Sequence, residues 1–305
     1  LADRLGVAPA YRELFESLLV MLGEDGILSR RDGAWLMPSP PADRDPAHDW
    51  AACSMHVPEF AAELELLRRA GSGLADVLAG RTHGIELLAP DASWEMLELC
   101  YRDTPSMRRQ NLAAQRVLAG VVEALDPARP LRILEVGGGT GGLTSWVLPA
   151  LPSHRVEYVF TDVAPVLVQQ TAARFAAWPA LRSMVLDLER DPVEQGFEPD
   201  SFDVILASNV LHATEDLRAS LDAAASLLAP GGLLLLIEPV GRSRILDIMF
   251  GVLDGWWRFA DRDLRPSSPL LAADQWLTLL TERGWQDPRV VDGAYDPEET
   301  PSALL

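Results

Sequence analysis

Residues 133–148 read ILEVGGGTGGLTSWVL: an apolar run closes on a glutamate, passes through five glycines and enters a segment with helical spacing. Glycine lets the backbone turn sharply and lets a ligand approach without meeting a Cβ, beside the N–H groups of a helix N-terminus. This order of strand, loop and helix is typical of nucleotide-binding α/β proteins. The stretch therefore predicts a nucleotide site, with Gly137 and Gly139 at the ligand.

From residue 131 onward, short apolar runs alternate with segments of helical spacing, which predicts a mostly parallel sheet with crossover helices. The predicted strands are residues 131–136, 156–162, 182–188, 202–209, 233–239 and 288–292. The predicted helices are residues 144–151, 166–178, 217–230 and 273–283, the third of them stopping at Pro230 and Gly231. We expect an α/β fold for residues 131–305.

Residues 1–130 show the spacing of amphipathic helices, as at 11–22, 60–69, 94–101 and 111–125, and no strand rhythm. The proline-rich polar stretch 37–49 predicts an exposed loop. We therefore expect two parts, a helical N-terminal lid subdomain (1–130) and a ligand-binding core (131–305).

The formal net charge of -19 has the wrong sign for binding nucleic acid or an anionic membrane. Cys53 and Cys100 form neither a metal-binding nor a disulfide pattern, so we expect no metal and a reducing, cytoplasmic location. No apolar run is long enough to span a bilayer. The chain opens on Leu1 rather than on Met, which suggests a piece of a longer polypeptide.

Two ligands fit the glycine loop, a dinucleotide and adenosylmethionine. Asp162 closes the second predicted strand, about 20 residues after the loop, where an acidic side chain binds a ribose. Glu135 would repel a pyrophosphate but suits a cationic ligand. Asp187, followed by Leu188, closes the third strand and could accept from an adenine amine, and polar Asn209 closes the fourth. Adenosylmethionine is therefore favoured; the plainer alternative is a tight turn in which Asp162 and Asp187 only cap helices.

Several long stretches resemble the methyltransferase domains embedded in modular type I polyketide synthases. They lie at residues 87–111, 157–165, 186–214, 227–239 and 250–276, and include LDLERDPVEQGFEPDSFDVILASNVLHAT and FGVLDGWWRFADRDLRPSSPLLAADQW. The resemblance implies a seven-stranded, Rossmann-like class I methyltransferase core with S-adenosyl-L-methionine as cofactor and S-adenosyl-L-homocysteine as product. It further implies a polyketide tethered to an acyl carrier protein, neighbouring synthase domains as partners, and a last strand near residues 302–305.

His212 and Glu238 look like the catalytic dyad of that family. Both lie at the carboxyl ends of strands that we expect to be neighbours, so their side chains should meet at one edge of the sheet. A carboxylate beside an imidazole fixes its tautomer and raises its basicity, as a general base requires. From the residues alone, a helix-start histidine and a capping glutamate would explain the pair equally well.

Four further residues are weaker candidates. Tyr101 could close over the cofactor and Asn111 over the substrate, while Trp256 and Trp257 could line an acyl tunnel; ordinary packing explains all four as well. Arg258, Arg262 and Arg265 could offer an acidic carrier protein a basic patch.

The sequence does not decide whether the methyl group is transferred to a carbon or to an oxygen atom of the substrate. A compact N-terminal region narrowly favours O-methylation of a β-hydroxyl, and C-methylation at the α-carbon of a β-ketoacyl thioester is the alternative. Two other functions are kept as hypotheses: a noncatalytic scaffold and a nicotinamide-dependent reductase.

Overall fold

The computed structural model describes residues 1–39, 45–126, 128–291 and 302–305. The chain forms two compact units: residues 1–97 with 243–257 make a helical unit, and residues 98–242 with 258–305 make a sheet unit. The chain therefore leaves the sheet unit after Arg242 and returns to it at Arg258. None of the helices in the described ranges is long and apolar enough to cross a membrane.

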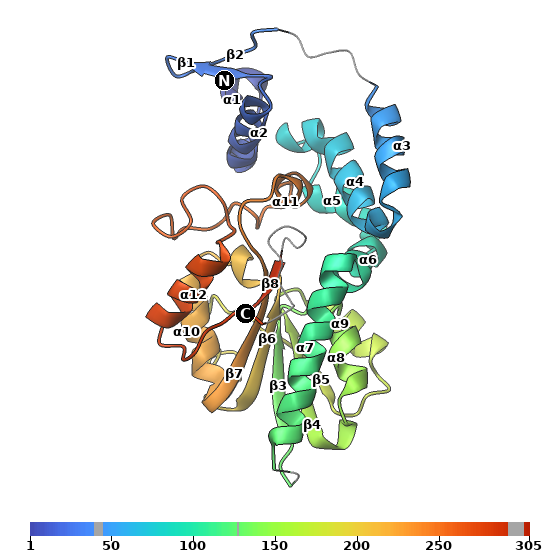
Figure 1. Ribbon diagram of the computed structural model, residues 1–305, viewed down its shortest axis with the longest axis vertical. Coiled ribbons are helices and arrows are strands. Elements are labelled where there is room, and N and C mark those ends of the chain that lie inside the picture. The colour runs from blue at the N-terminus through green and yellow to red at the C-terminus, as the bar shows by residue number, and fades with distance from the viewer. Residues whose placement is uncertain (40–44, 127, 292–301) are drawn as a thin grey trace. The chain divides into compact units, whose positions relative to one another are not determined.

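The sheet unit is built on one sheet whose strands run parallel, except that β8 is antiparallel to β7 (Figure 1). In spatial order the strands are β5 (Leu181–Val185), β4 (Val156–Asp162), β3 (Leu131–Val136), β6 (Phe202–Ser208), β7 (Leu228–Pro239) and β8 (Ser302–Leu304). The α/β prediction is confirmed, and β3 and β4 have the predicted bounds. The order reverses between β3 and β6, and ligands bind at such a switch point in open α/β sheets.

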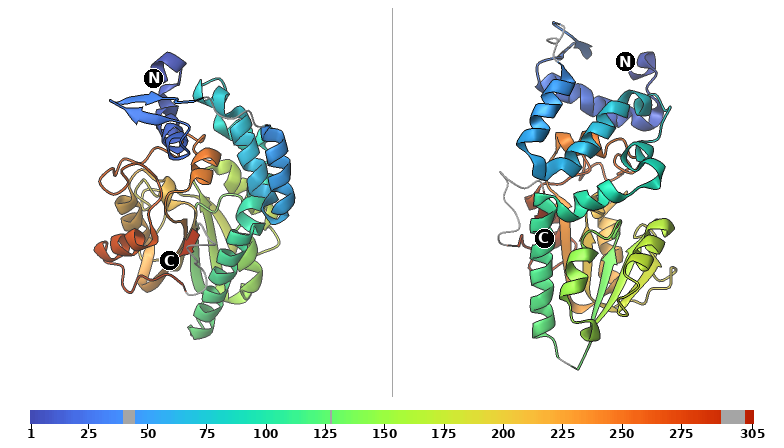
Figure 2. Two further views of the ribbon diagram at one scale, coloured as in Figure 1. Left: turned by 45° about the horizontal axis from the view of Figure 1, so that its top comes forward. Right: turned by 90° about the vertical axis from the view of Figure 1, so that its right-hand side faces the viewer.

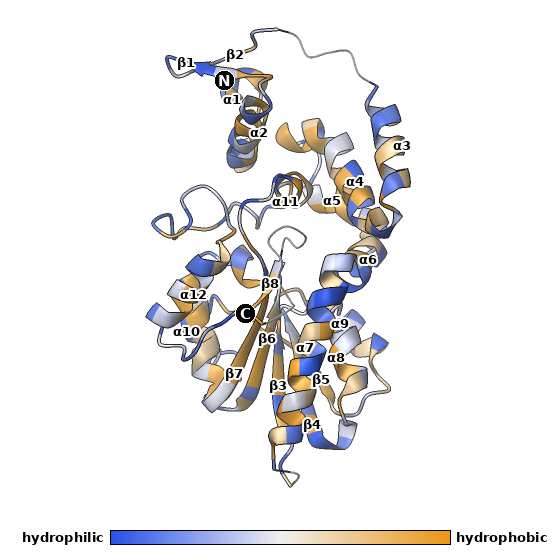
Figure 3. Cartoon of the chain, viewed as in Figure 1, coloured by the Kyte–Doolittle hydropathy of each residue, from blue (hydrophilic) through white to orange (hydrophobic). Residues whose placement is uncertain are grey.

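Helices cover both faces of this sheet, so its central strands are mostly apolar (Figure 3). Apolar side chains of α7 and α8 join the core on one face, and those of α10 and α12 join the core on the other. The helical segments here are α7 (Pro105–Ala124), α8 (Thr144–Val147), η4 (Leu148–Ala150), η5 (Ser153–Arg155), α9 (Pro165–Arg174), η6 (Leu211–Ala213), α10 (Leu217–Leu227) and α12 (Ala273–Glu282).

The long helix α7 lies along the sheet, as Figures 1 and 2 show, although the sequence placed it in a lid ending at residue 130. Its buried stripe includes Met107, Ala114 and Leu118, which pack in the core beside β3. An amphipathic helix buries its apolar stripe where a complementary face exists, and the sheet offers one. By contacts the division falls near residue 98 rather than at 130.

The helical unit contains a short hairpin that the sequence did not predict. Its strands β1 (Ser29–Arg31) and β2 (Ala34–Leu36) pair through a turn at Asp32 and Gly33, which both have positive φ. The remaining segments are α1 (Ala2–Leu5), η1 (Pro9–Tyr11), α2 (Arg12–Glu24), α3 (Pro46–His56), η2 (Pro58–Phe60), α4 (Ala61–Leu78), α5 (Gly84–Leu88), η3 (Pro90–Ala92) and α11 (Arg244–Met249), with α6 (Glu95–Asp103) continuing into the sheet unit.

The predicted ends of the exposed loop 37–49 and of the helix 217–230 are wrong. Residues 46–49 of the expected loop begin α3, because Pro46 suits a first helical position and Asp45 accepts from the N–H of Ala47; residues 40–44 lie outside the described ranges. Helix α10 ends at Leu227 rather than at Pro230, since β7 begins at once.

The predicted seven strands are six in the described part of the chain. Residues 288–291 form no strand, although the N–H of Val291 donates to the carbonyl of Leu304 at 2.9 Å; Asp292 is not among the described residues. The expected last strand is present as β8.

Truncation of a core side chain tests this packing. Ile133 of β3 is fully buried, so Ile133→Ala should lower the free energy of unfolding by about 2–5 kcal/mol. Ile245→Ala, at an exposed isoleucine, should change it by less than about 0.5 kcal/mol. Urea denaturation followed by circular dichroism gives both values, and equal losses would contradict the assigned core.

Candidate active site

The glycine loop between β3 and α8 is fixed against β4. The N–H of Gly138 donates to the carbonyl of Thr161 at 2.8 Å, and that of Gly139 donates to Asp162 Oδ2 at 2.9 Å. Gly137 and Gly139 have positive φ, of 58° and 56°. A Cβ on Gly138 would lie 2.1 Å from the ring of Phe160. The loop therefore tolerates no side chain at Gly138 and presents bare backbone at the carboxyl edge of the sheet.

Glu135 is a buried carboxylate with one oxygen engaged in hydrogen bonds. Oε2 accepts from Thr144 Oγ1 at 2.6 Å and from the Tyr158 hydroxyl at 2.7 Å, whereas Oε1 is buried with no hydrogen-bond partner among the described residues. Burial, together with a smaller contribution from the charge of Asp162, raises the pKa of Glu135 to about 7, although the hydrogen bonds from Thr144 and Tyr158 oppose the rise. A buried acceptor without a partner is costly unless a ligand satisfies it. Oε1 therefore suits the ammonium of a cationic ligand.

Thr144 and Tyr158 were not singled out from the sequence. Tyr158 pairs with Ile133, two residues before Glu135, so both side chains lie on the same face of the sheet. A polar aromatic residue within the apolar run 156–162 was the available signal.

Asp162 supports the loop with both of its oxygens. Besides Gly139, it accepts from the N–H of Ala164 at 2.8 Å, immediately before α9. Burial raises the pKa of this carboxyl, and the two backbone N–H groups oppose the rise. The capping alternative is thus present in the structure, but each oxygen has a second lone pair for a ribose hydroxyl. The ribose contact stays a prediction.

Asp187 and Leu188 follow β5 at the same edge of the sheet. The side-chain amide of Gln195 accepts from the N–H of Asp187 and donates to its carbonyl, at 2.8 Å each. Asp187 Oδ1 accepts from the N–H of Glu189. Leu188 is buried in the core on the α10 and α12 face. An adenine contact would therefore use the carboxylate of Asp187 and the backbone of Leu188.

Asn209 lies directly after β6 and has a left-handed backbone conformation, with φ of 57°. Its N–H donates to the carbonyl of Ile237 at 2.7 Å, and its amide donates to Ser208 Oγ at 3.1 Å. Asparagine tolerates this backbone conformation better than most residues. The conformation ends the strand and starts the turn that leads to His212.

His212 and Glu238 meet, as the order of strands predicted. His212 Nδ1 lies 2.6 Å from Glu238 Oε2, and Glu238 Oε1 accepts from the N–H groups of Val210 at 3.1 Å and Leu211 at 2.8 Å. Glu238 is fully buried and His212 is 6% exposed. An ionised Glu238 only accepts, so Nδ1 carries the proton and Nε2 carries the lone pair of the neutral ring.

The dyad and the glycine loop are in contact through Val210. A Cβ on Gly137 would lie 2.5 Å from a methyl of Val210, whose own N–H is bound to Glu238. A ligand on the loop and a group at His212 therefore share one edge of the sheet.

Tyr101 and Asn111 contact each other rather than standing as separate groups. The buried amide of Asn111 donates to the carbonyls of Tyr101 at 3.1 Å and Arg102 at 3.5 Å, at the end of α6. A Cβ on Gly142 would lie 2.9 Å from the carbonyl oxygen of Tyr101, so the end of α6 rests on the glycine loop. Burial raises the pKa of Tyr101, as do Cys100 and Glu238. Asn111 thus supports Tyr101, and their ligand contacts stay predictions.

Trp256 and Trp257 are buried in the helical unit. The indole N–H of Trp256 donates to Asp247 Oδ1 at 3.0 Å, and that of Trp257 donates to the carbonyl of Gly251 at 2.9 Å. Both N–H groups therefore serve packing within this unit, and a part in an acyl tunnel stays a prediction.

The proposed basic patch is wrong for Arg265, which is 1% exposed. Arg258 is at the surface, where it pairs with Glu189 at 2.6 Å. In the described ranges no group of three or more His, Cys, Asp or Glu side chains could hold a metal ion.

Comparison with known proteins identifies close relatives. Residues 134–234 match a family model described as a methyltransferase domain. Polyketide synthase ThaG of Burkholderia thailandensis is 37% identical over 93% of this chain, which spans 5% of that protein. The CurJ carbon methyltransferase is 37% identical with a TM-score of 0.93, and the DszA carbon methyltransferase is 30% identical with 0.91; each comparison covers 99% of this chain, and 81% and 80% of the other. The trans-methyltransferase CalH in complex with SAH is 26% identical with 0.75, over 99% of this chain and 84% of the other.

Gly138→Ala tests whether the ligand lies on the loop. The added methyl group must displace Phe160, and such overpacking costs about 1–3 kcal/mol. We expect the affinity for adenosylmethionine in a calorimeter to fall about tenfold or more. Gly120→Ala on α7, where a Cβ meets nothing within 4 Å, is the matched control and should leave affinity unchanged. Unchanged affinity in the Gly138 variant would place the ligand elsewhere.

The raised pKa of Glu135 predicts that ligand binding depends on pH. Below about pH 7 most Glu135 is protonated and cannot pair with an ammonium, so affinity should rise from about pH 5.5 to pH 7 with release of a proton.

In the unliganded protein the same ionisation should lower the free energy of unfolding as the pH rises through about 7, since the folded pKa lies above that of an exposed glutamate.

Calorimetry in buffers of different ionisation enthalpy measures this proton release. Glu135→Gln keeps the shape of the side chain and should flatten the pH profile. An equally steep profile in that variant would assign the titration to another group.

Proposed function

We propose that this chain, which belongs to the adenosylmethionine-dependent methyltransferase domains of polyketide synthases, methylates the α-carbon of a β-ketoacyl chain on an acyl carrier protein. The observation that carries the proposal is the buried His212–Glu238 pair at the edge of the sheet that also bears the glycine loop. The fold is the class I methyltransferase fold.

The residues around the loop fit adenosylmethionine. Glu135 Oε1 is a buried acceptor without a described partner, and the loop has no space for a Cβ at Gly138. Asp162 ends β4, and Asp187 lies just after the neighbouring strand β5. Glu135 would hold the ammonium, and the two aspartates would hold the ribose and the adenine. When bound, adenosylmethionine supplies a methyl group on a positively charged sulfur and leaves as adenosylhomocysteine.

His212 acts as the general base in this proposal. Its Nε2 takes a proton from the α-carbon, and the electrons of that C–H bond pass into an enolate of the ketone. The enolate carbon then bonds to the methyl group while the electrons of the methyl–sulfur bond stay on sulfur. Glu238 stabilises the imidazolium, because its carboxylate already accepts from Nδ1.

Carbon is a better acceptor than oxygen for this base. A carbon between a ketone and a thioester is far more acidic than an alcohol, so an imidazole can take its proton before methyl transfer. The names of the CurJ and DszA enzymes support carbon as well. The narrow preference for a β-hydroxyl gains no support from these comparisons, and O-methylation is retained as an outcome of the test.

The carrier protein and the neighbouring synthase domains are part of the proposal. The chain spans a small part of ThaG, and that relative is a polyketide synthase, whose intermediates we take to be held as thioesters. A methyltransferase within such an assembly would receive its substrate on a carrier.

Intact-mass analysis of carrier-bound substrates tests the acceptor. Carrier protein loaded in parallel with β-ketoacyl and β-hydroxyacyl chains should gain about 14 Da, the mass of one CH₂, on the ketoacyl chain only, with fragmentation placing it on carbon. His212→Ala should lower the rate by about 10²–10⁴-fold. His154→Ala, at an exposed histidine of the same unit, is the control and should keep the rate.

Other outcomes would overturn parts of the proposal. A gain only on the hydroxyacyl chain would establish O-methylation. No gain on either chain, together with no binding of adenosylmethionine, would favour a noncatalytic scaffold. A full rate in His212→Ala would remove His212 as the base.

A further inference from the structure

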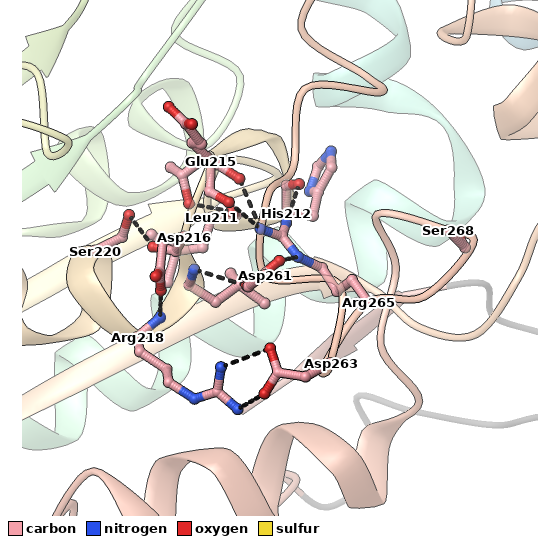
Figure 4. A network of polar contacts seen from close by, with 12 residues as sticks. Leu211, His212, Glu215, Asp216, Arg218, Ser220, Asp261, Asp263, Arg265 and Ser268 are labelled. Atoms are coloured by element: carbon pink, nitrogen blue, oxygen red, sulfur yellow. Dashed lines mark hydrogen bonds and ion pairs between the residues drawn. The ribbon is translucent and has the colours of Figure 1, made fainter. Parts of the chain in front are cut away.

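Arg265 is a buried arginine whose donors are directed at one short stretch of main chain (Figure 4). Nη1 donates to the carbonyl of His212 at 2.8 Å, and Nη2 donates to the carbonyls of Thr214 at 2.8 Å and Glu215 at 3.0 Å. These residues are η6 and the link to α10. One side chain therefore binds the main chain at His212 and at two of the three residues after it.

Asp261 completes this arrangement on the far side of the guanidinium. Its Oδ1 accepts from Arg265 Nε at 2.6 Å, and its Oδ2 accepts from the N–H of Leu217 at 3.1 Å, in the first turn of α10. Asp261 and Arg265 have side chains that are 1% and 0% exposed. The ring of Phe259, itself buried, lies 5.2 Å from the guanidinium carbon. Two buried charges thus bind the main chain at His212, Thr214, Glu215 and Leu217.

His212 is consequently held from two sides. Glu238 fixes the ring through Nδ1 and fixes the N–H groups of Val210 and Leu211, whereas Arg265 fixes the carbonyl of His212 itself. The ring can turn about its own bonds, so its carboxylate contact does not determine where the Cα lies. Arg265 supplies that second constraint.

We propose that Arg265, held by Asp261, is a positioning residue that sets the main chain of His212 so that Nε2 faces the acceptor. The inference rests on the proposed role of His212 as the base. Arginine suits this task because its planar fork offers five donors in fixed directions, whereas a lysine ammonium is a flexible point donor. Retention of the charge alone should therefore not preserve the position of His212.

Arg265→Lys is the principal test, since it keeps a cation beside Asp261. We expect kcat to fall roughly 10²-fold, the scale of a misplacement of about 1 Å, with the KM values for adenosylmethionine and carrier substrate changed less than about threefold. The proton that His212 Nδ1 shares with Glu238 should move or broaden in the NMR spectrum of histidine-labelled protein, assigned with His212→Ala. Arg218→Lys is the matched control, because Arg218 pairs with Asp263 at 2.9 Å on the surface nearby (Figure 4).

A second variant separates position from folding. Asp261→Asn keeps the size of the side chain but weakens the hold on Arg265, and it should lower kcat in the same direction with a smaller effect. Thermal unfolding of each variant in the whole chain shows whether the fold is retained. If Arg265→Lys unfolds, Asp261→Asn still decides the question through its kcat and its Nδ1 proton.

The proposal and the proposed function fail differently. Wild-type kcat and an unchanged Nδ1 proton in folded Arg265→Lys, with His212→Ala inactive, would overturn the positioning role alone. Equal losses of kcat in Arg265→Lys and Arg218→Lys would also overturn it. Full activity of His212→Ala would instead remove the base on which the inference rests.

Discussion

The carboxylate of Glu238 is the contact on which the geometry of the candidate site depends. It is buried at the end of β7 and accepts from two backbone N–H groups and from His212 Nδ1. A buried carboxylate is stable only when such donors satisfy it. The turn after β6 must therefore approach β7 closely, and this requirement brings His212 to the edge of the sheet. The left-handed Asn209 that starts the turn and the contact of Val210 with Gly137 follow from the same constraint.

The glycine loop is held in place by the neighbouring strand β4. Its backbone is bound to Thr161 and Asp162 on β4, while Phe160 excludes a side chain at Gly138. Strand β3 lies between β4, which supports the loop, and β6, which leads to His212 of the dyad. In the proposed function, methyl transfer needs a cofactor and a base side by side, and the switch point between these strands would provide both positions.

Much of this could be predicted from the sequence, because buried parallel strands and a glycine loop leave local signals. The bounds of β3 and β4, the meeting of His212 with Glu238, and the methyltransferase class were all available in advance. The hairpin at Asp32 and Gly33 was missed because its strands are three residues each, too short for a rhythm. Arg265 was misread as a surface group because burial of a charge depends on its partners. Its spacing of four from Asp261 on a helix-like turn was the only local sign.

The return of residues 243–257 to the helical unit constrains how such domains can be recombined. Asp247 accepts from Ser17 Oγ at 3.2 Å, and the carbonyl of Val252 lies only 2.0 Å from where a Cβ on Gly84 would be. Segments distant in sequence thus share one core. A hybrid made by exchanging residues 1–97 alone would pack foreign helices against native residues 243–257. The exchangeable module of this domain is discontinuous, and its natural junctions are three rather than one.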